Sequence, residues 1–255
     1  MTAWRPRPKR ERNGRRQRHR GSERRDQGLA GILPHIMEDI ELLARSELFS
    51  AFEQIALERL VGAARTVECE RNMVIFEEDD EAEEVFVVRS GRIAVGRRSF
   101  DGRESLVALM EGGDVFGEMS LFDEGGRSAS ARALERSEVL GIPYGVVRES
   151  LDANPQLLWE VVRLLAQRLR NTDSALADAV FLDVTGRTAK RLLELAGDQD
   201  EFHLPVTQEE LAGLVGASRE RVNKSIAAFV RLGWVEQYER RYRILERDRL
   251  AQRAR

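Results

Sequence analysis

Cysteine and histidine are scarce in this sequence. The chain of 255 residues has one cysteine, Cys69, and three histidines, His19, His35 and His203. One thiol cannot form an internal disulfide, a zinc site made of several cysteines, or an iron–sulfur cluster. None of the histidines lies in the strand-rich region described below, which argues against a haem there. We therefore expect a reducing compartment and predict no metal site and no cofactor.

Long apolar runs are also absent. No segment approaches the roughly 18 consecutive apolar residues that a transmembrane helix needs, although 42% of the residues are hydrophobic. The N-terminus is charged but no apolar core follows it, so it is not a secretory signal. These observations predict a cytoplasmic protein with no membrane partner. No nucleophile–base pair and no cluster of metal ligands stands out, so we predict no catalytic residues and no enzyme activity.

Charge is distributed unevenly along the chain. In residues 1–26, ten arginines and one lysine against three acidic residues give a local net charge of +8. The whole chain has a net charge of −3, so the remainder carries −11. The tail has too few apolar residues to bury a core, which predicts disorder. It is either a basic arm that adds nonspecific affinity for nucleic acid or an extension without a role, with Met37 as an alternative start.

The region from residue 37 to residue 153 changes from a helical to a strand-like pattern. Apolar residues at helical spacing predict a helix between Ile40 and Leu60. Short apolar or alternating runs follow, separated by glycine turns, at 73–76, 85–88, 93–96, 106–110 and 139–143. Strands of this length, with glycines spaced this regularly, predict a compact antiparallel roll or barrel.

A long helical pattern begins after Asn154-Pro155 and contains no breaking residue from 156 to 184. Its apolar stripe advances in steps of four and three residues, which is a heptad seam. The seam consists of Leu158, Val162, Leu165, Leu169, Thr172, Leu176 and Ala179. Such a seam predicts pairing with an identical helix in a parallel homodimer. The alternative is an ordinary helix that faces its own core.

Two short helices joined by a glycine turn lie in the last part of the chain. The pattern predicts a helix over 187–196 and an acidic loop over 198–206. A helix from Thr207 to about Val215, with a Thr207–Glu210 capping box, is followed by a Gly216-Ala217 turn. The next helix, over 219–232, is capped by Ser218, and a hairpin follows around 239–240. Helix, tight turn and helix form the helix-turn-helix signature. The hairpin after it would be a wing.

Charged and polar side chains gather at the start of the second of these helices, at Arg219, Glu220, Arg221, Asn223 and Lys224. Arginine can pair both acceptors on a guanine edge, and glutamate can accept from a cytosine amine. A helix that enters the major groove with its N-terminal end presents its first turns to the bases. The alternative is a solvated charged face, but the position directly after the turn favours DNA reading. The domain is not strongly basic, so affinity should come from a focused surface.

The segment VFGEMSLFDEGGRSASARA, residues 115–133, places an acid and a base on opposite sides of one tight loop. Arg127 supplies a forked cationic donor that suits a phosphate, and Gly117 lets the backbone approach closely. The turn that starts at Met119, after Glu118, can direct backbone amides at an anion. These features favour a small ligand with hydroxyls and a phosphate. The alternative is a structural ion pair on a loop.

These pieces, in this order, resemble the cyclic AMP receptor (catabolite activator) family, within the wider Crp–Fnr superfamily. The resemblance covers about residues 38–255 and is carried by FGEMSLF with RSA (116–122 and 127–129), FLDVTGR (181–187) and VTQEELAGLVGASRERVNKSI (206–226). The first pattern occurs in cyclic-nucleotide-binding domains generally, and only the attached helix-turn-helix narrows it to a transcription regulator. The implied fold is α+β, with a disordered basic tail over 1–36, an antiparallel β-roll cyclic-nucleotide-binding domain over 37–153, a long dimerisation helix over 154–184 and a winged helix-turn-helix domain over 185–255.

The resemblance implies a role for each residue of the ligand site. Glu118 takes the ribose 2′-hydroxyl, and Arg127 and Ser128 take the cyclic phosphate. Thr172 and the partner subunit's Asp173 reach the purine. The full implied set is Gly117, Glu118, Met119, Arg127, Ser128, Arg168, Thr172 and Asp173, with Arg168 near the phosphate and the glutamate.

Asp173 departs from the small neutral polar residue of the receptor type. An ionised carboxylate only accepts hydrogen bonds, and adenine presents an amine where guanine presents an oxygen. Cyclic AMP is therefore the expected effector and cyclic GMP the alternative.

Three positions of the reading helix contact bases in this family, and here they are Arg219, Glu220 and Lys224, the last usually an arginine. The expected DNA-binding set is Thr207, Gln208, Ser218, Arg219, Glu220, Arg221, Asn223 and Lys224. The resemblance implies a dimeric, ligand-gated regulator with a two-fold symmetric operator in double-stranded DNA and RNA polymerase as partners. A ligand-independent DNA binder with a degenerate sensor domain is the alternative, and the intact Glu118, Arg127 and Ser128 favour the gated regulator.

Overall fold

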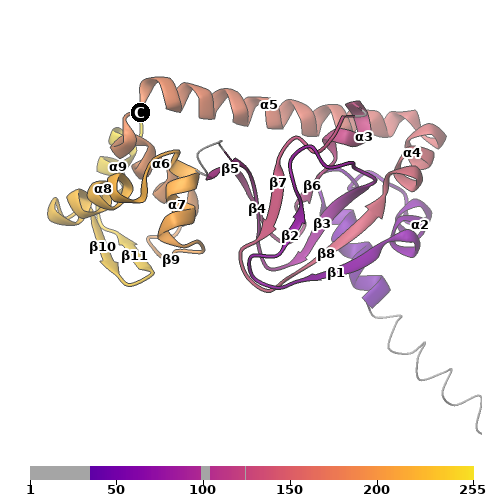
Figure 1. Ribbon diagram of the computed structural model, residues 1–255, viewed down its shortest axis with the longest axis horizontal. Coiled ribbons are helices and arrows are strands. Elements are labelled where there is room, and N and C mark those ends of the chain that lie inside the picture. Colours follow the sequence, from indigo (N-terminus) through magenta and orange to yellow (C-terminus); the bar gives the residue numbers. More distant parts are fainter. Residues whose placement is uncertain (1–34, 99–103, 124) are drawn as a thin grey trace, which may run out of the picture. The chain divides into compact units, whose positions relative to one another are not determined.

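The computed structural model describes residues 35–98, 104–123 and 125–255, and Figure 1 shows the order of its helices and strands. The chain divides into a unit of residues 1–38 and a unit of residues 39–255. The basic tail expected over 1–36 lies outside the described residues, apart from its last two.

Two four-stranded antiparallel sheets form the roll, with strand orders β1-β8-β3-β6 and β2-β7-β4-β5. The strands are β1 (Arg65–Cys69), β2 (Val74–Phe76), β3 (Glu84–Ser90), β4 (Ile93–Arg98), β5 (Glu104–Met110), β6 (Val115–Phe116), β7 (Ser130–Ala133) and β8 (Ser137–Pro143). Each of the five apolar runs predicted as strands falls on β2, β3, β4, β5 or β8. The predicted antiparallel roll is confirmed.

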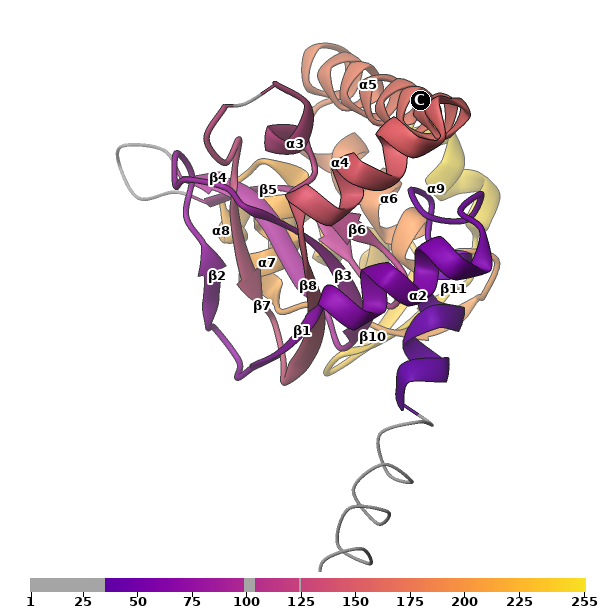
Figure 2. The ribbon, with the colours of Figure 1, turned by 90° about the vertical axis from the view of Figure 1, so that its right-hand side faces the viewer.

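Helices close one side of the roll. The single helix predicted between Ile40 and Leu60 is wrong, because turns over 46–53 separate a helix over 35–45 from α2 (Gln54–Ala63). Figure 2 shows α2 beside α4 (Tyr144–Ala153), and both helices pack against β8. Apolar side chains from these two helices, from the helix and turns over 35–53 and from β3 and β8 form one continuous core, which includes Leu43, Phe49, Leu60, Val87 and Ile142.

The long helix is α5 (Leu158–Phe181), preceded by a 3₁₀ turn over Pro155–Leu157. It is shorter than the sequence pattern predicted. Leu182 adopts an extended backbone, and the Asp183 side chain accepts a hydrogen bond from the Gly186 amide at 2.8 Å, which caps the next helix. An aspartate in this capping position starts a new helix instead of continuing the old one.

The last part of the unit contains α6 (Val184–Ala196), β9 (Glu201–His203), α7 (Gln208–Val215), α8 (Arg219–Arg231), β10 (Val235–Tyr238), β11 (Arg241–Ile244) and α9 (Arg247–Arg253). The capping box between Thr207 and Glu210 is confirmed, and Ser218 caps α8 as predicted. Strands β10, β11 and β9 pair antiparallel, so the predicted wing forms and gains a third strand from the acidic loop. Leu192, Val206, Leu211, Phe229 and Tyr242 fill the core between helices and sheet.

Candidate functional site

The Phe-Gly-Glu turn leads from β6 into α3 (Met119–Asp123). Gly117 adopts a φ of +75°, and a Cβ added there would lie 2.5 Å from Nη1 of Arg127. Both the backbone conformation and the close approach therefore require glycine. The turn brings Gly117, Glu118 and Arg127 together, as the sequence predicts.

Glu118 is completely buried, with a side-chain exposure of 0%. Nη1 of Arg168 lies 2.7 Å from its Oε1, and Nη2 of the same arginine donates to the Val115 carbonyl at 2.6 Å. Within the described part of the chain, neither carboxylate oxygen of Glu118 receives a well-aligned hydrogen bond. Burial raises the pKa of the Glu118 carboxyl, and the positive charge of Arg168 opposes that shift. The predicted proximity of Arg168 to the glutamate is thus observed.

Arg127 is also buried, at 5% exposure. Its backbone is fixed by the acidic loop before β3, where the Asp79 amide donates to its carbonyl and its own amide donates to the Asp80 carbonyl, each at 2.9 Å. The guanidinium lies 4.1 Å from the centre of the Phe76 ring, which is a cation–π contact. Burial lowers the pKa of the guanidinium.

Ser128 and Met119 lie at the exposed side of the same turn. The Ser128 hydroxyl is 3.4 Å from the sulfur of Met119, and both residues are exposed. A weak sulfur contact of this kind leaves the hydroxyl able to donate to a ligand. The site therefore combines a buried acid and cation with an exposed hydroxyl.

The two residues expected to reach a purine are on α5 and are exposed. The Thr172 hydroxyl donates back to the Arg168 carbonyl at 3.0 Å, one turn earlier in the helix. Asp173 is exposed as well. No hydrogen bond connects either residue to the 117–128 turn among residues the structure places. Of the expected ligand set, six residues gather around the turn, and these two remain on the open face of the helix.

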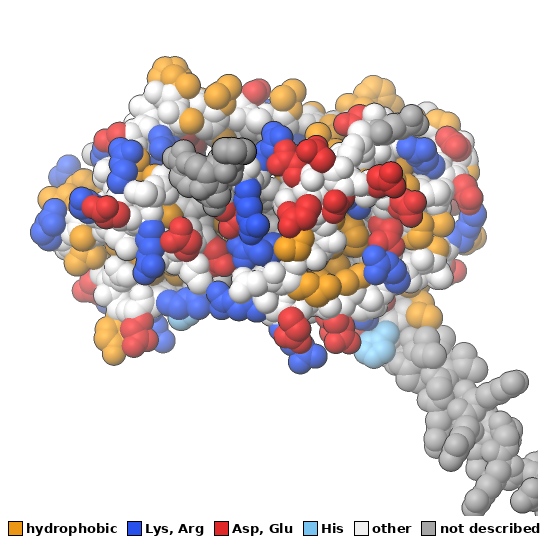
Figure 3. All heavy atoms as spheres, viewed as in Figure 1, with side chains coloured by type: hydrophobic (Ala, Val, Ile, Leu, Met, Phe, Trp, Pro, Cys, Tyr) orange, Lys and Arg blue, Asp and Glu red, His pale blue; other side chains and the backbone are white. Residues whose placement is uncertain are grey.

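That open face is apolar. Leu158, Val162, Leu169 and Leu176 of the seam are exposed, the last two at 62% and 63%. Figure 3 shows hydrophobic side chains along the edge of the molecule that α5 occupies in Figure 1. The other side of the helix packs on the roll through the buried Val161 and Leu164. Most of the seam therefore points away from the core, and only Leu165 among its leucines and valines is partly buried against the roll.

The predicted reading helix, α8, presents its polar side chains to solvent. Arg219, Glu220, Arg221, Asn223 and Lys224 are exposed, while Val222, Ser225, Ile226 and Phe229 are buried. Lys224 pairs with Glu220 at 2.7 Å, so the charges of these two side chains offset each other on the free protein. A groove of about 430 Å³ runs beside the helix and is lined by Thr207, Gln208, Arg219 and Asn223 together with Gln237 and Arg240 of the wing. Sequence reasoning missed the wing residues, although their position in the predicted hairpin could have indicated them.

Sequence reasoning also missed two arginines of α6 that hold the turn between α7 and α8. Arg187 donates to the carbonyls of Leu182 and Val215 at 2.8 and 2.9 Å, and Arg191 donates to the Leu214 carbonyl at 3.1 Å. The last carbonyls of a helix lack partners within the helix, and a cation there also complements the helix dipole. Arg187 lies in the FLDVTGR segment, and this motif could have indicated that the arginine has a structural role.

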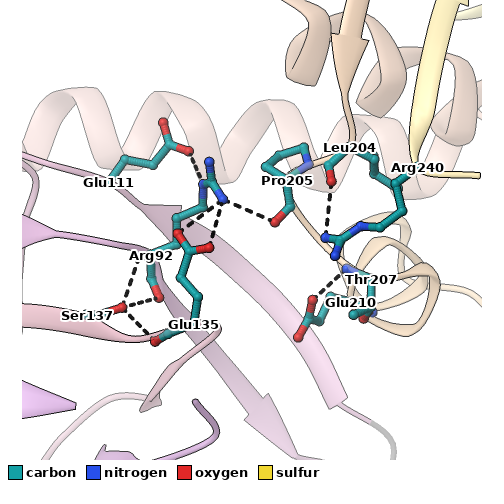
Figure 4. A network of polar contacts seen from close by, with 9 residues as sticks. All are labelled: Arg92, Glu111, Glu135, Ser137, Leu204, Pro205, Thr207, Glu210 and Arg240. Carbon is teal, nitrogen blue, oxygen red and sulfur yellow. Dashed lines mark hydrogen bonds and ion pairs between the residues drawn. The ribbon is translucent and has the colours of Figure 1, made fainter. Parts of the chain in front are cut away.

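The roll contacts the helix-turn-helix domain through Arg92, just before β4 (Figure 4). Arg92 binds Glu111 at 2.8 Å and Glu135 at 3.2 Å, and its Nη1 donates to the Pro205 carbonyl at 3.4 Å. Pro205 lies two residues before Thr207, whose amide donates to Glu210 at 2.7 Å. The position of α7 is therefore connected to the second sheet of the roll.

The described residues show neither a metal centre nor a membrane span. Over 35–98, 104–123 and 125–255, no group of three or more His, Cys, Asp or Glu side chains is placed to hold a metal ion. In the same ranges, no helix combines the length and apolarity needed to cross a bilayer.

Comparisons with known proteins agree with this architecture. Residues 66–154 match the cyclic nucleotide-binding domain family, and residues 186–253 match the Crp-like helix-turn-helix domain family. The fold resembles the solved structure of FixK2 from Bradyrhizobium japonicum, with a TM-score of 0.68 and 21% identity over 74% of this chain and 96% of that one. At that identity the likeness concerns the fold alone.

Two curated relatives are more similar in sequence and indicate the family. The CRP-like cAMP-activated global transcriptional regulator of Mycobacterium tuberculosis is 39% identical over 222 residues, which cover 84% of this chain and 99% of the relative. The cAMP-activated global transcriptional regulator CRP of Pasteurella multocida is 36% identical over 152 residues, which cover 57% of this chain and 73% of the relative. The chain therefore belongs to the Crp–Fnr superfamily of transcription regulators, and it joins a cyclic nucleotide-binding domain to a Crp-like helix-turn-helix domain.

Proposed function

We propose that this protein is a dimeric regulator whose binding to a two-fold symmetric operator is controlled by cyclic AMP. The observation that carries the proposal is the incompletely paired interior of the Phe-Gly-Glu turn: in the described structure neither Glu118 carboxylate oxygen receives a well-aligned hydrogen bond beyond the 2.7 Å ion pair of Oε1 with Arg168, and Arg127 Nε has no hydrogen-bond partner. Unpaired buried polar atoms are unfavourable until a ligand completes them. A ribose hydroxyl can donate to Glu118, and a cyclic phosphate can accept from Arg127 and Ser128.

The names of the relatives support the same ligand, because both proteins are described as cAMP-activated. A ligand-independent regulator would have no need for a buried acid and cation that the chain leaves partly unpaired. Cyclic AMP binding by the roll is therefore better supported than a degenerate sensor domain.

Each of the four parts of the chain has a proposed role. Residues 1–36 form a basic tail, 37–153 the ligand-binding roll, 154–184 the dimerisation helix and 185–255 the DNA-binding domain. The two family matches fall within the second and fourth parts, apart from residue 154. The start of α6 at Val184, after its cap Asp183, supports a boundary near residue 185.

The exposed seam supports the dimer. Five of its seven members are leucine or valine, and an identical helix would remove them from water. In a two-fold dimer the two copies of α8 read two half-sites about one helical turn of DNA apart. RNA polymerase is the expected partner of the DNA-bound dimer.

Asp173 is proposed to select the purine across this seam. It is exposed on α5 directly after Thr172 of the seam, so a partner helix would bring it toward the other subunit's ligand. As an acceptor it can hold the adenine amine and repels the guanine oxygen in the same pose. Binding would satisfy the carboxylate across the interface, fix the register of the two α5 helices, and couple ligand to DNA.

We expect wild-type protein to bind cyclic AMP more tightly than cyclic GMP, and Asp173→Ser to reduce this preference. The serine can donate as well as accept, so it tolerates the guanine oxygen. Isothermal titration calorimetry with both nucleotides on both proteins measures the preference. Equal binding of the two nucleotides by wild type, or identical discrimination by the variant, would show that Asp173 does not choose the base.

We expect Arg219→Ala to weaken binding to a selected operator by about 1–3 kcal/mol and to relax the preference at one base pair. The side chain is exposed in the first turn of α8 and lines the groove beside it. Arg231→Ala, at the exposed far end of the same helix, is the matched control and should retain sequence preference. Fluorescence anisotropy with the operator and with random DNA distinguishes a contact to a base from a contact to a phosphate. An equal loss on both duplexes would assign Arg219 to a phosphate contact.

A further inference from the structure

The hydrogen bonds of Arg127 leave one edge of its guanidinium unused. Nη1 donates to the Gly117 carbonyl at 2.7 Å and to the Tyr144 hydroxyl at 3.0 Å, and Nη2 donates to the Glu84 carbonyl at 2.9 Å. A guanidinium has five N–H donors in a fixed plane. Two therefore remain, one on Nη2 and one on Nε, and Nε has no partner within the described residues.

Nε–H and one N–H of Nη2 lie on the same edge of the guanidinium plane, and both are available to a ligand when the Glu84 carbonyl accepts from the other N–H of Nη2. An edge of this kind forms two parallel hydrogen bonds with a phosphate or a carboxylate. A cyclic phosphodiester offers two exocyclic oxygens and one negative charge. The free edge of Arg127 thus suits the anionic part of the proposed ligand.

Tyr144 is the one side chain among the three groups that accept hydrogen bonds from the Arg127 guanidinium. It is the first residue of α4 and is 7% exposed, and its amide donates to the Glu83 carbonyl at 2.8 Å. Its hydroxyl donates to the Gly117 carbonyl and accepts from Arg127 Nη1, so these three groups form a closed triangle. Burial raises the pKa of this hydroxyl, which keeps it protonated and able to donate at neutral pH.

We propose that Tyr144 is a positioning residue for the ligand phosphate: it engages Nη1 of Arg127 and so turns the Nε–Nη2 edge toward the two exocyclic oxygens. The proposal rests on the proposed function, because it assumes that the site takes a cyclic nucleotide. Nothing in the sequence pattern marks Tyr144, which lies 17 residues after Arg127. Only the packing of α4 against the roll brings the two together.

A guanidinium edge that is held in one orientation should distinguish the two exocyclic oxygens of the phosphate. The two phosphorothioate diastereomers of cyclic AMP carry sulfur at one or the other exocyclic position, and sulfur is a weaker acceptor than oxygen. An oriented guanidinium distinguishes them, because its two donors meet different oxygens. In Tyr144→Phe, Nη1 loses one acceptor and the guanidinium can turn, so discrimination between the diastereomers should decrease.

The test measures the affinities of cyclic AMP, its Sp and Rp phosphorothioates and adenosine by competition against a fluorescent cyclic nucleotide. For Tyr144→Phe we expect cyclic AMP to bind about 3- to 10-fold more weakly, the magnitude of one hydrogen bond. We expect the Sp/Rp affinity ratio to move toward one, and adenosine, which lacks a phosphate, to be unaffected. Tyr242→Phe removes another buried tyrosine hydroxyl, in the DNA-binding domain, and should leave the ratio unchanged.

Arg127→Lys keeps the charge but lacks the fork, and it should also move the ratio toward one. This second variant keeps the test decisive if Tyr144→Phe lowers the melting temperature of the unliganded protein. An unchanged ratio with all four ligands weakened equally would overturn the proposal and leave Tyr144 a purely structural residue. Failure of wild type to bind any cyclic nucleotide would instead overturn the proposed function.

Discussion

Glu118→Gln is expected to weaken cyclic AMP binding by about 10- to 150-fold and, at neutral pH, to stabilise the unliganded protein. Hydrogen bonds to charged groups contribute about 1.5–3 kcal/mol, and the glutamine amide offers the ribose hydroxyl only a neutral acceptor. The same change removes a completely buried carboxylate that lacks well-aligned donors in the described structure. Arg168 loses its partner but keeps the Val115 carbonyl, and its side chain is 30% exposed, so its charge reaches water.

The stability gain depends on pH in a defined direction. Burial raises the pKa of Glu118 above its ordinary 4.5, so the folded state favours the protonated acid. That contribution to folding is complete below the ordinary pKa and is lost as the pH rises through the folded pKa. Glutamine does not titrate. The variant should therefore match wild type in acid and become relatively more stable as the pH increases toward neutrality.

Urea unfolding across this pH range measures the stability difference, and calorimetry measures the binding. Glu149→Gln is the control, because Glu149 forms an exposed pair with Arg59 and should change neither property beyond about 0.5 kcal/mol. A Glu118→Gln protein that binds cyclic AMP as tightly as wild type would remove Glu118 from the ligand site. A stability difference that shrinks as the pH rises would contradict the account of its burial.

Leu169→Asp is expected to weaken the dimer by about 100-fold or more and to reduce operator binding with it. Leu169 is 62% exposed in the centre of the seam on α5. In a two-fold dimer the same residue enters the interface from both subunits. Two carboxylates would then be desolvated next to each other, which costs several kcal/mol unless they are protonated or the helices separate.

Gln167→Asp adds the same charge two residues away, on an exposed position outside the seam, and should leave the dimer intact. Sedimentation velocity at several concentrations, with and without cyclic AMP, measures the dimer dissociation constant of each protein. A wild-type monomer at micromolar concentration, or a Leu169→Asp dimer as stable as wild type, would rule out the seam as the interface.

Structural features that depend on neighbouring residues could be predicted from the sequence, whereas features that depend on distant residues could not. The helix-turn-helix could be predicted residue by residue, because Thr207, Glu210, Gly216 and Ser218 act on backbone groups within a few positions of themselves. The break between the long helix and the next one was predicted, at 185–186, but the structure places it about three residues earlier, where Asp183 caps α6. A long apolar periodicity obscured that single residue.

The short strands β1, β6 and β7 escaped prediction for a different reason. The segment Ser130–Ala133 contains no β-branched or aromatic residue, and β6 contains only Val115 and Phe116. The segment Ser130–Ala133 becomes a strand because β2 and β4 supply hydrogen bonds, and not because of its own propensity, whereas β6 is too short to show a pattern. Pairing between distant parts of the chain is invisible to a local pattern.

The ligand site shows the same division. Gly117, Glu118 and Arg127 could be grouped because one short loop contains them. The pairing of Arg168 with Glu118 joins α5 to a turn 50 positions earlier in the chain, and it followed only from the family resemblance. The orientation of Arg127 depends on carbonyls of Gly117 and Glu84 and on Tyr144, and no sequence motif specified it.

The central claim is that one ligand controls DNA binding, and a DNA titration with and without cyclic AMP tests it most directly. Duplexes are first selected from random sequence by the cyclic AMP-loaded protein, and the enriched site is then titrated by fluorescence anisotropy. The account predicts a two-fold symmetric site, tighter DNA binding in saturating cyclic AMP, and an equal factor by which the site tightens cyclic AMP binding. The same affinity for the selected site in the presence and absence of cyclic AMP would contradict it.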